Sequence, residues 1–153
     1  MDVREVVLNL KVDHIVILDM FEELATAKPE DARKLFAILR QLLTNHFIVE
    51  EFYLYPFARK KKREADRMLR GLFGGTGVGD LKILATELKK FQSVGEQVVR
   101  LMTECSNCPD EAFAPCVNNV IALVRKRIVY EEEVLLKPID TSPARMKKKT
   151  VYP

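Results

Sequence analysis

Apolar residues recur every three or four positions in four separate segments of this chain, and this spacing restricts its fold more than any other feature. The segments run from Val7 to Leu24, from Pro29 to Tyr53, from Asp80 to about Glu104, and from Pro109 to just before Pro138. Such a period places the apolar side chains of a segment on one face of a helix, and no alternating strand pattern lies between the segments. The sequence therefore predicts an all-α protein folded as an up-and-down four-helix bundle.

The breaks between the segments indicate short connections within one domain. Pro29 suits the first turn of a helix, Pro56 predicts a kink or a bend, and glycines are dense between Gly71 and Gly79. At 153 residues the chain is long enough to bury a core without disulfide bonds. We expect residues 1–138 to form the bundle. Residues 139–153 are rich in proline and lysine and lack periodicity, so we expect them to trail from it as a basic, flexible C-terminal tail.

Composition and charge exclude several classes of function. Hydrophobic residues make up 48% of the chain, yet no apolar run reaches the roughly 20 residues of a membrane span. The N-terminus lacks the basic and then apolar layout of a signal peptide, so we expect a cytoplasmic protein. The net charge is only +3, and the basic clusters at 59–63 and 145–149 contain no stacking aromatic residue. Neither nucleic acid nor a membrane is therefore an expected partner.

Four ionisable side chains fall on helix faces that are otherwise apolar. They are His14 in the first segment, His46 and Glu50 in the second, and Glu132 in the fourth. His46 and Glu50 are four residues apart and therefore share a helix face. Burying a carboxylate or an imidazole without a partner is costly, so the four groups need a shared solution. A bound cation is one solution, and a buried histidine–glutamate hydrogen-bond network without metal is the other.

Three short motifs lie on these helix faces. They are Asp13-His14, then His46-x-x-x-Glu50-Glu51 followed by Tyr55-Pro56, and finally Glu132-Glu133 followed by Pro138. Together they resemble the hemerythrin-like, or HHE cation-binding, family, and the resemblance covers the chain from about Val7 to Pro138. It implies four helices around two irons that are bridged by two carboxylates and oxygen species. Members of that family bind or sense dioxygen, iron or redox state.

The resemblance also implies a role for each matching residue. His14 and His46 match the histidines of one iron, and Glu50 and Glu132 match the two bridging carboxylates. A ligating histidine usually donates its other ring nitrogen to an oxygen atom, so Asp13 can orient an imidazole from outside the ligand set. One half of the family's metal site is therefore complete in this sequence.

The other half is incomplete. The histidine positions of the second iron correspond to Asp80 and Ile128, and an isoleucine side chain has no lone pair to donate. Asp80 stands at the expected start of a helix, where it is either a metal ligand or an N-cap. Glu131 and Glu133 are interpreted as solvent-side groups or as partners of the ligands. We therefore expect one metal ion in a mononuclear or asymmetric site, with iron as the first choice and manganese or zinc as alternatives.

The function expected from these residues is a hemerythrin-like metal-binding protein that senses or handles oxygen, iron or redox state, with the metal ion and a small ligand such as dioxygen as partners. One alternative is a non-haem iron oxidoreductase that acts on dioxygen or peroxide. Another is a metal-free bundle that serves as a protein-interaction module. The two histidines are both assigned to the core, so we predict no nucleophile and base pair for covalent catalysis.

Three cysteines surround the expected connection between the third and fourth helices. Cys105 and Cys108 form a C-x-x-C pair, and Cys116 follows. The alternatives are a redox-linked disulfide, with Cys105 and Cys108 as the expected pair, a three-thiolate metal site, and ordinary thiols in a reducing cytoplasm.

Overall fold

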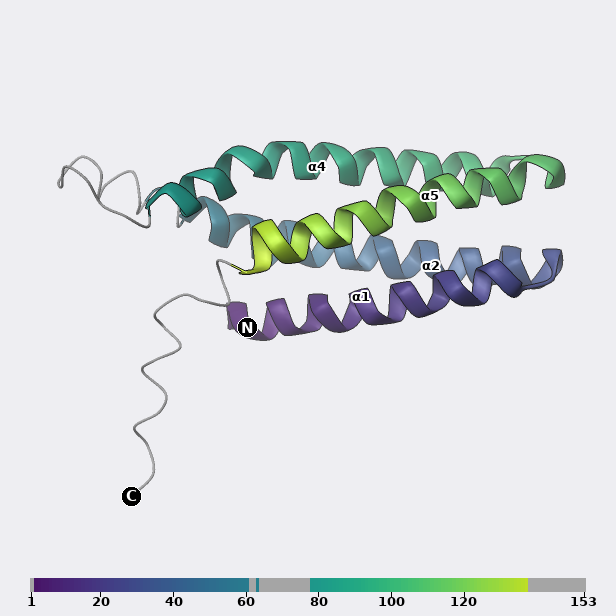
Figure 1. Ribbon diagram of the computed structural model, residues 1–153, viewed down its shortest axis with the longest axis horizontal. Coiled ribbons are helices and arrows are strands. Elements are labelled where there is room, and N and C mark those ends of the chain that lie inside the picture. The colour runs from purple at the N-terminus through teal and green to yellow at the C-terminus, as the bar shows by residue number, and fades with distance from the viewer. Residues whose placement is uncertain (1, 61–62, 64–77, 138–153) are drawn as a thin grey trace, which may run out of the picture.

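The structure, a computed structural model, describes residues 2–60, 63 and 78–137, and the side chains of all of these except 78–87. The expected 139–153 tail lies outside the described residues. The long helices are α1 (Val3–Thr26), α2 (Pro29–Val49), α4 (Val78–Asn107) and α5 (Asp110–Tyr130). They lie side by side, and each runs antiparallel to the next along the chain (Figure 1).

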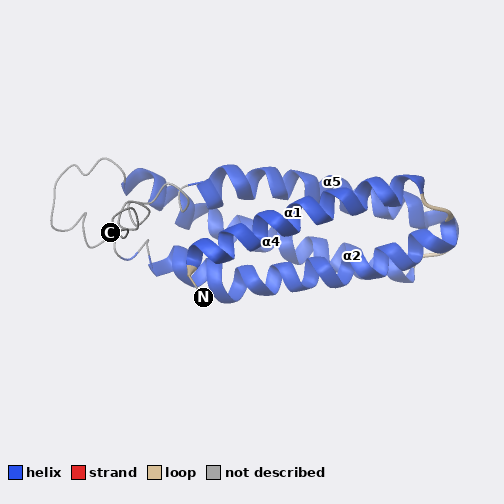
Figure 2. Ribbon diagram, turned by 90° about the horizontal axis from the view of Figure 1, so that it is seen from below, coloured by secondary structure: helices blue, strands red, loops and turns tan. Residues whose placement is uncertain are grey.

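The packing order of the helices is that of an up-and-down bundle. α1 packs on α2, α2 on α4, α4 on α5, and α5 back on α1. The described residues contain no strand. Short loops join α1 to α2 and α4 to α5 at the end of the bundle opposite the N-terminus (Figure 2). The all-α, four-helix architecture predicted from the apolar spacing is therefore confirmed. Among the described residues, no helix combines the length and the apolar character needed to cross a membrane.

Local signals explain where the helices begin. Asp2 is the N-cap of α1, and its side chain accepts a hydrogen bond from the Arg4 backbone N–H at 3.3 Å. α2 begins at Pro29, where the missing N–H and preset φ of proline suit a first turn, and acidic Glu30 and Asp31 follow. The apolar pattern alone placed the first helix from Val7, so the cap adds one turn to it.

A wider, π-helical turn follows α2 and another follows α5. These turns are η1 (Glu50–Leu54) and η2 (Glu131–Leu136), and each begins with a buried glutamate. In η1 the Tyr55 N–H bonds to the Glu50 carbonyl five residues back, directly before Pro56. A proline ring clashes with the carbonyl four residues before it, and the wider turn relieves that clash. The bend expected at Pro56 thus takes the form of a π-helical turn, and residues 55–60 continue as helix.

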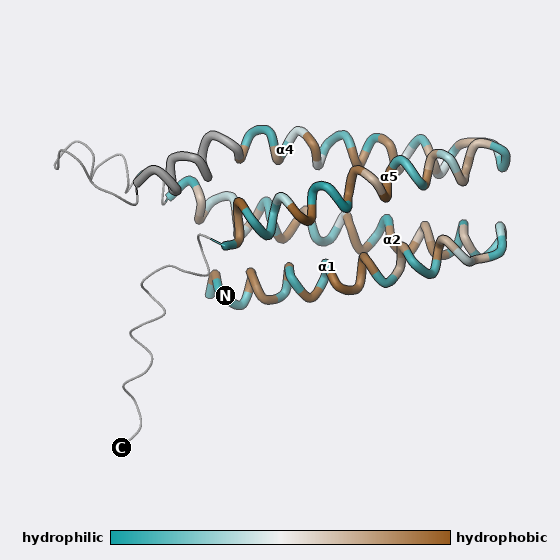
Figure 3. The backbone as a smooth tube through the Cα atoms, in the orientation of Figure 1, coloured by the Kyte–Doolittle hydropathy of each residue, from teal (hydrophilic) through white to brown (hydrophobic). Residues whose placement is uncertain are grey.

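The core consists of two apolar clusters with the ionisable residues between them. One cluster includes Ile17 and Leu43 and extends toward the two short loops, while the other contains Leu10, Leu54 and Leu135. Figure 3 shows apolar and polar residues alternating along each helix, as expected when one face is buried. The gap between the clusters falls at the level of His14 in α1, so the polar residues there sit deep in the bundle and not at its ends.

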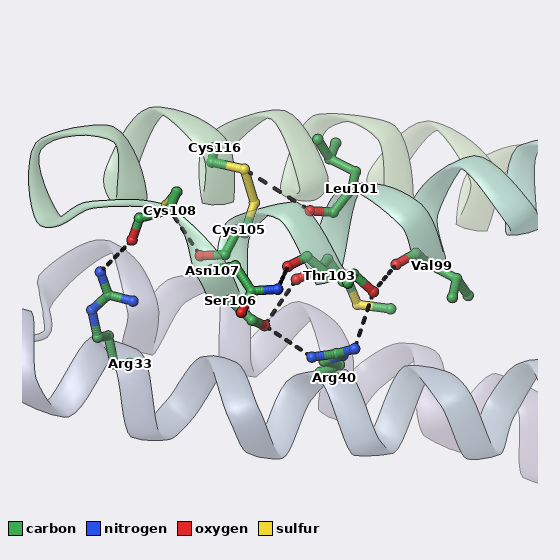
Figure 4. The surroundings of a disulfide bond; sticks show 11 residues. Arg33, Arg40, Val99, Leu101, Thr103, Cys105, Ser106, Asn107, Cys108 and Cys116 are labelled. Carbon is green, nitrogen blue, oxygen red and sulfur yellow. Dashed lines mark hydrogen bonds between the residues drawn. A yellow bond between two sulfur atoms is a disulfide. The ribbon is translucent and has the colours of Figure 1, made fainter.

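The cysteines pair differently from the expected C-x-x-C disulfide. Cys105, in the last turns of α4, forms a disulfide with Cys116 of α5, and their Cα atoms are 5.5 Å apart (Figure 4). Cys108 is a free thiol whose Sγ donates to the Cys105 carbonyl at 3.1 Å. The Cys105–Cys108 link, considered as one of three alternatives, is therefore wrong. α4 stays helical through Asn107, so the buried Cys105 side chain faces α5 and not the loop that holds Cys108.

Candidate metal centre

His46 and Glu50 meet as their spacing predicts. They lie one turn apart where α2 passes into η1, with relative exposures of 2% and 0%. His46 Nε2 is 3.0 Å from Glu50 Oε1. Because both groups are fully enclosed by the bundle, neither can exchange its partner for water.

Two more residues complete the cluster from the other half of the bundle. His14 of α1 lies beside His46, with ring centroids 5.0 Å apart. Glu131, the first residue of η2, places Oε2 3.2 Å from His14 Nε2 and 3.6 Å from His46 Nε2. One ligand atom each from His14, His46 and Glu131 lie within 4.8 Å of one another. The Nε2 atoms of two histidines and a carboxylate thus converge on one buried point.

The outer nitrogens of both rings are held by carboxylates. His14 Nδ1 lies 2.8 Å from Glu132 Oε1, and His46 Nδ1 lies 3.1 Å from Asp13 Oδ2. Asp13 therefore orients the imidazole of His46 on the neighbouring helix, and not that of His14 beside it in sequence. Such outer contacts fix the ring orientation and direct Nε2 of both histidines into the cluster.

The donor set fits a divalent cation. Glu50 Oε1 and Glu131 Oε1 are buried and make no hydrogen bond of good geometry within the described protein, although Glu50 Oε1 lies in ion-pair contact with His46 Nε2 at 3.0 Å. A buried carboxylate oxygen without a partner is unfavourable, and a cation is the partner that would satisfy both glutamates at once. Two imidazole nitrogens with carboxylate oxygens are also a set that iron, manganese and zinc accept. The side chains in this cluster therefore fit a divalent metal ion such as iron, manganese or zinc.

The electrostatics of the side chains alone favour protonated histidines. Burial lowers the pKa of His46, but the carboxylates of Asp13, Glu131 and Glu50 outweigh burial and raise that pKa to about 11. The pKa of His14 is also raised, because Glu131 and Glu132 overcome the cost of its burial. Burial raises the pKa of Glu131, yet the two histidines hold it well below its ordinary value. A cation that binds here must therefore displace protons from the imidazoles.

A buried arginine lies on the far side of Glu50. Arg127 of α5 is 4% exposed, and its Nη2 donates to Glu50 Oε2 at 2.5 Å. The Tyr55 hydroxyl donates to the same oxygen at 3.2 Å. Burial and the charge of Glu131 raise the pKa of Glu50, while His46 and Arg127 lower it. Glu50 therefore turns one oxygen toward the histidines and the other toward a guanidinium.

The burial of Arg127 was not predicted from the sequence, and Glu131 was interpreted as a solvent-side group or a partner of the ligands. The signal was present in the spacing, because Val117, Val120, Val124, Arg127 and Glu131 follow steps of three and four and are all buried. Charged side chains on such a stripe are usually predicted to be solvent-exposed, since an arginine or a glutamate is rarely buried without a partner.

Glu132, predicted as a metal ligand, stands outside the inner cluster. Glu132 is 43% exposed and contacts the outer nitrogen of His14, while its neighbour Glu131 holds the inner position. The π-helical turn that begins at Glu131 shifts the faces presented by the residues after it. Asp80 is the third residue of α4, after the helix has begun at Val78, and its side chain lies outside the described part of the chain. Ile128 packs in the apolar core.

Comparison with protein-family models supports the assignment of this cluster as a cation-binding site. The sequence model of the hemerythrin HHE cation-binding domain matches residues 6–139, which is most of the chain and nearly all of the described bundle. No curated protein and no solved structure matches the sequence. The matched residues include His14, His46, Glu50 and Glu131, the four side chains that converge in the core. The chain therefore belongs to the hemerythrin HHE cation-binding domain family.

Proposed function

We propose that this protein binds one non-haem iron ion in the bundle core and uses it to sense or handle dioxygen, iron or redox state. The observation that carries the proposal is the convergence of His14 Nε2, His46 Nε2 and Glu131 Oε2 in a buried site where Glu131 Oε1 makes no hydrogen bond within the described protein. Glu50 Oε1, 3.0 Å from His46 Nε2, supplies the fourth donor. Glu132 and Asp13 hold the rings from outside.

This ligand set suits a metal that keeps positions open for a small molecule. Two histidines and one or two carboxylates leave part of an iron(II) coordination sphere for an added ligand, which is the chemistry that the metal supplies when bound. A cavity of about 440 Å³ between α2 and α4 is lined by Tyr55 and Arg127, both of which contact Glu50. Tyr55 and Arg127 therefore separate this cavity from the proposed ligand Glu50 by one layer of side chains.

The test is a metal count on tag-free protein purified from iron-supplemented medium, beside His46→Ala and the surface variant Glu22→Ala. The wild type and Glu22→Ala are expected to hold about one iron per chain, and His46→Ala is expected to hold almost none. A wild-type protein that takes up no iron, manganese or zinc after reconstitution would contradict the proposal and favour the metal-free interaction module.

An oxidoreductase that acts on dioxygen or peroxide uses the same site and the same cavity. Repeated turnover of peroxide that disappears in His46→Ala would favour it over a sensor. Stoichiometric and reversible change in the iron spectrum, without turnover, would favour sensing.

A further inference from the structure

The guanidinium of Arg127 is bound as a metal ion would be, by oxygen atoms on several sides. Nη2 donates to Glu50 Oε2 at 2.5 Å and to the Tyr55 hydroxyl at 3.3 Å, and Nη1 donates to the Phe91 carbonyl at 2.5 Å. The guanidinium carbon lies over the rings of Phe91 and Phe47, 3.7 Å and 4.6 Å from their centroids. A carboxylate, a hydroxyl and a carbonyl form an oxygen set of the kind that hard divalent cations prefer.

Space for this guanidinium comes from a glycine inside a helix. A Cβ on Gly95 of α4 would lie 3.0 Å from Arg127 Nη1 and 3.4 Å from the guanidinium carbon. Glycine in a helix interior costs about 1 kcal/mol relative to alanine. The chain thus carries a helix-weakening residue at the point where a side chain would force the Arg127 guanidinium to shift by a few tenths of an ångström.

Glu50 joins this oxygen set to the proposed metal site. Its Oε1 faces His46 Nε2 at 3.0 Å, and its Oε2 is held by Arg127 and Tyr55. Glu50 and Glu131 are both buried, and two carboxylates in a core of low dielectric need two positive charges nearby. A divalent metal at the histidines would supply two positive charges on the Oε1 side of Glu50, and the guanidinium supplies a further one on the Oε2 side that is covalently attached to the chain.

We propose that Arg127 is a built-in second cation that restricts the site to a single metal ion. It occupies the oxygen set of Glu50, Tyr55 and Phe91, and it leaves Glu50 only Oε1 to offer to the metal. The inference rests on the proposed function, because it describes the neighbour of that same metal.

The test is a titration of the full-length, metal-free chain with Mn²⁺, an air-stable probe, followed by metal analysis and electron paramagnetic resonance. The wild type is expected to bind one Mn²⁺ per chain, with the spectrum of an isolated ion. Arg127→Ala opens the oxygen set and is expected to bind two, with a spin-coupled spectrum that shows the ions to be neighbours. Arg127→Lys keeps the charge and is expected to bind one, as is Arg125→Ala, which removes an exposed arginine from the same helix.

A folded Arg127→Ala protein that still binds one Mn²⁺ would overturn the inference and leave the proposed function in place, provided that His46→Ala loses that ion. The alanine variant leaves Glu50 without its ion pair and can fail to fold. In that case the wild type decides, because two spin-coupled Mn²⁺ ions in the wild type also overturn the inference and one isolated ion supports it. A wild type that binds no Mn²⁺ overturns this inference, whereas the proposed function falls with it only if the iron count of the wild type is also zero.

Discussion

Metal binding to this protein is expected to release about two protons and to strengthen steeply as the pH rises. His46 has a pKa of about 11 and His14 has a pKa above its ordinary 6.5, so both imidazoles are largely protonated at pH 6.5 or below. A nitrogen can bind a metal only after it has lost its proton. Glu131 adds none to the count, because its pKa is held well below the usual range and it is already ionised.

The size of the effect follows from the number of protons displaced. Each displaced proton changes the apparent affinity about tenfold, or about 1.4 kcal/mol, for every pH unit. Two protons therefore give about a hundredfold change, or about 2.7 kcal/mol, per pH unit. The sign is that of competition, since protons and metal seek the same nitrogens, so binding weakens as the pH falls.

Isothermal titration calorimetry with Zn²⁺ between about pH 5.5 and 6.5 measures this directly. In this range the aqueous ion, whose water has a pKa of about 9, remains unhydrolysed. Buffers with different ionisation enthalpies report the number of protons released per metal ion. His46→Gln is expected to release about one proton fewer than the wild type. An affinity that does not change with pH, or a release of no protons, would refute either the ligand role of the histidines or their protonation.

Three further results are expected. The metal-free protein should lose up to about 1.4 kcal/mol of unfolding free energy per pH unit as the pH rises from about 6.5 toward 11. The reason is that the raised pKa of His46 stabilises the fold only while the imidazole is protonated. Urea unfolding at several pH values measures this slope, and His46→Gln should flatten it. Glu131→Gln should weaken Zn²⁺ binding far more than Glu132→Gln, because only Glu131 reaches Nε2 of both histidines; equal losses in calorimetry would show that the half-exposed glutamate binds the metal itself. Cys116→Ser should lower the free energy of unfolding by about 3 kcal/mol, as expected for a short disulfide-closed loop. Cys108→Ser should leave it nearly unchanged. Equal thermal unfolding of the two variants would count against the Cys105–Cys116 pairing.

Much of the architecture could be predicted from the sequence, because it depends on local spacing. A period near 3.6 identified the four helices, and His14 and His46 were placed on their inward faces by the apolar residues around them. The contact between His46 and Glu50 follows from a separation of four residues within one helix. None of these inferences requires knowledge of which helices are neighbours.

The rest of the site depends on contacts between residues far apart in the chain. Arg127 can be buried because its guanidinium donates hydrogen bonds to Glu50, 77 residues earlier, and to the Phe91 carbonyl. No local sequence pattern predicts these partners. The same holds for the choice of Cys116 over Cys108, which depends on α5 lying against α4.

The sequence by itself determined the helices, their buried faces and the two inward histidines, because a helix brings residues three and four apart together wherever it occurs. Only the tertiary structure decided that Glu131 and not Glu132 completes the inner cluster, since that choice depends on the rotation of α5 and its π-helical turn against α1 and α2. It likewise placed a guanidinium beside Glu50, because burying a charge is favourable only where another helix supplies its partners.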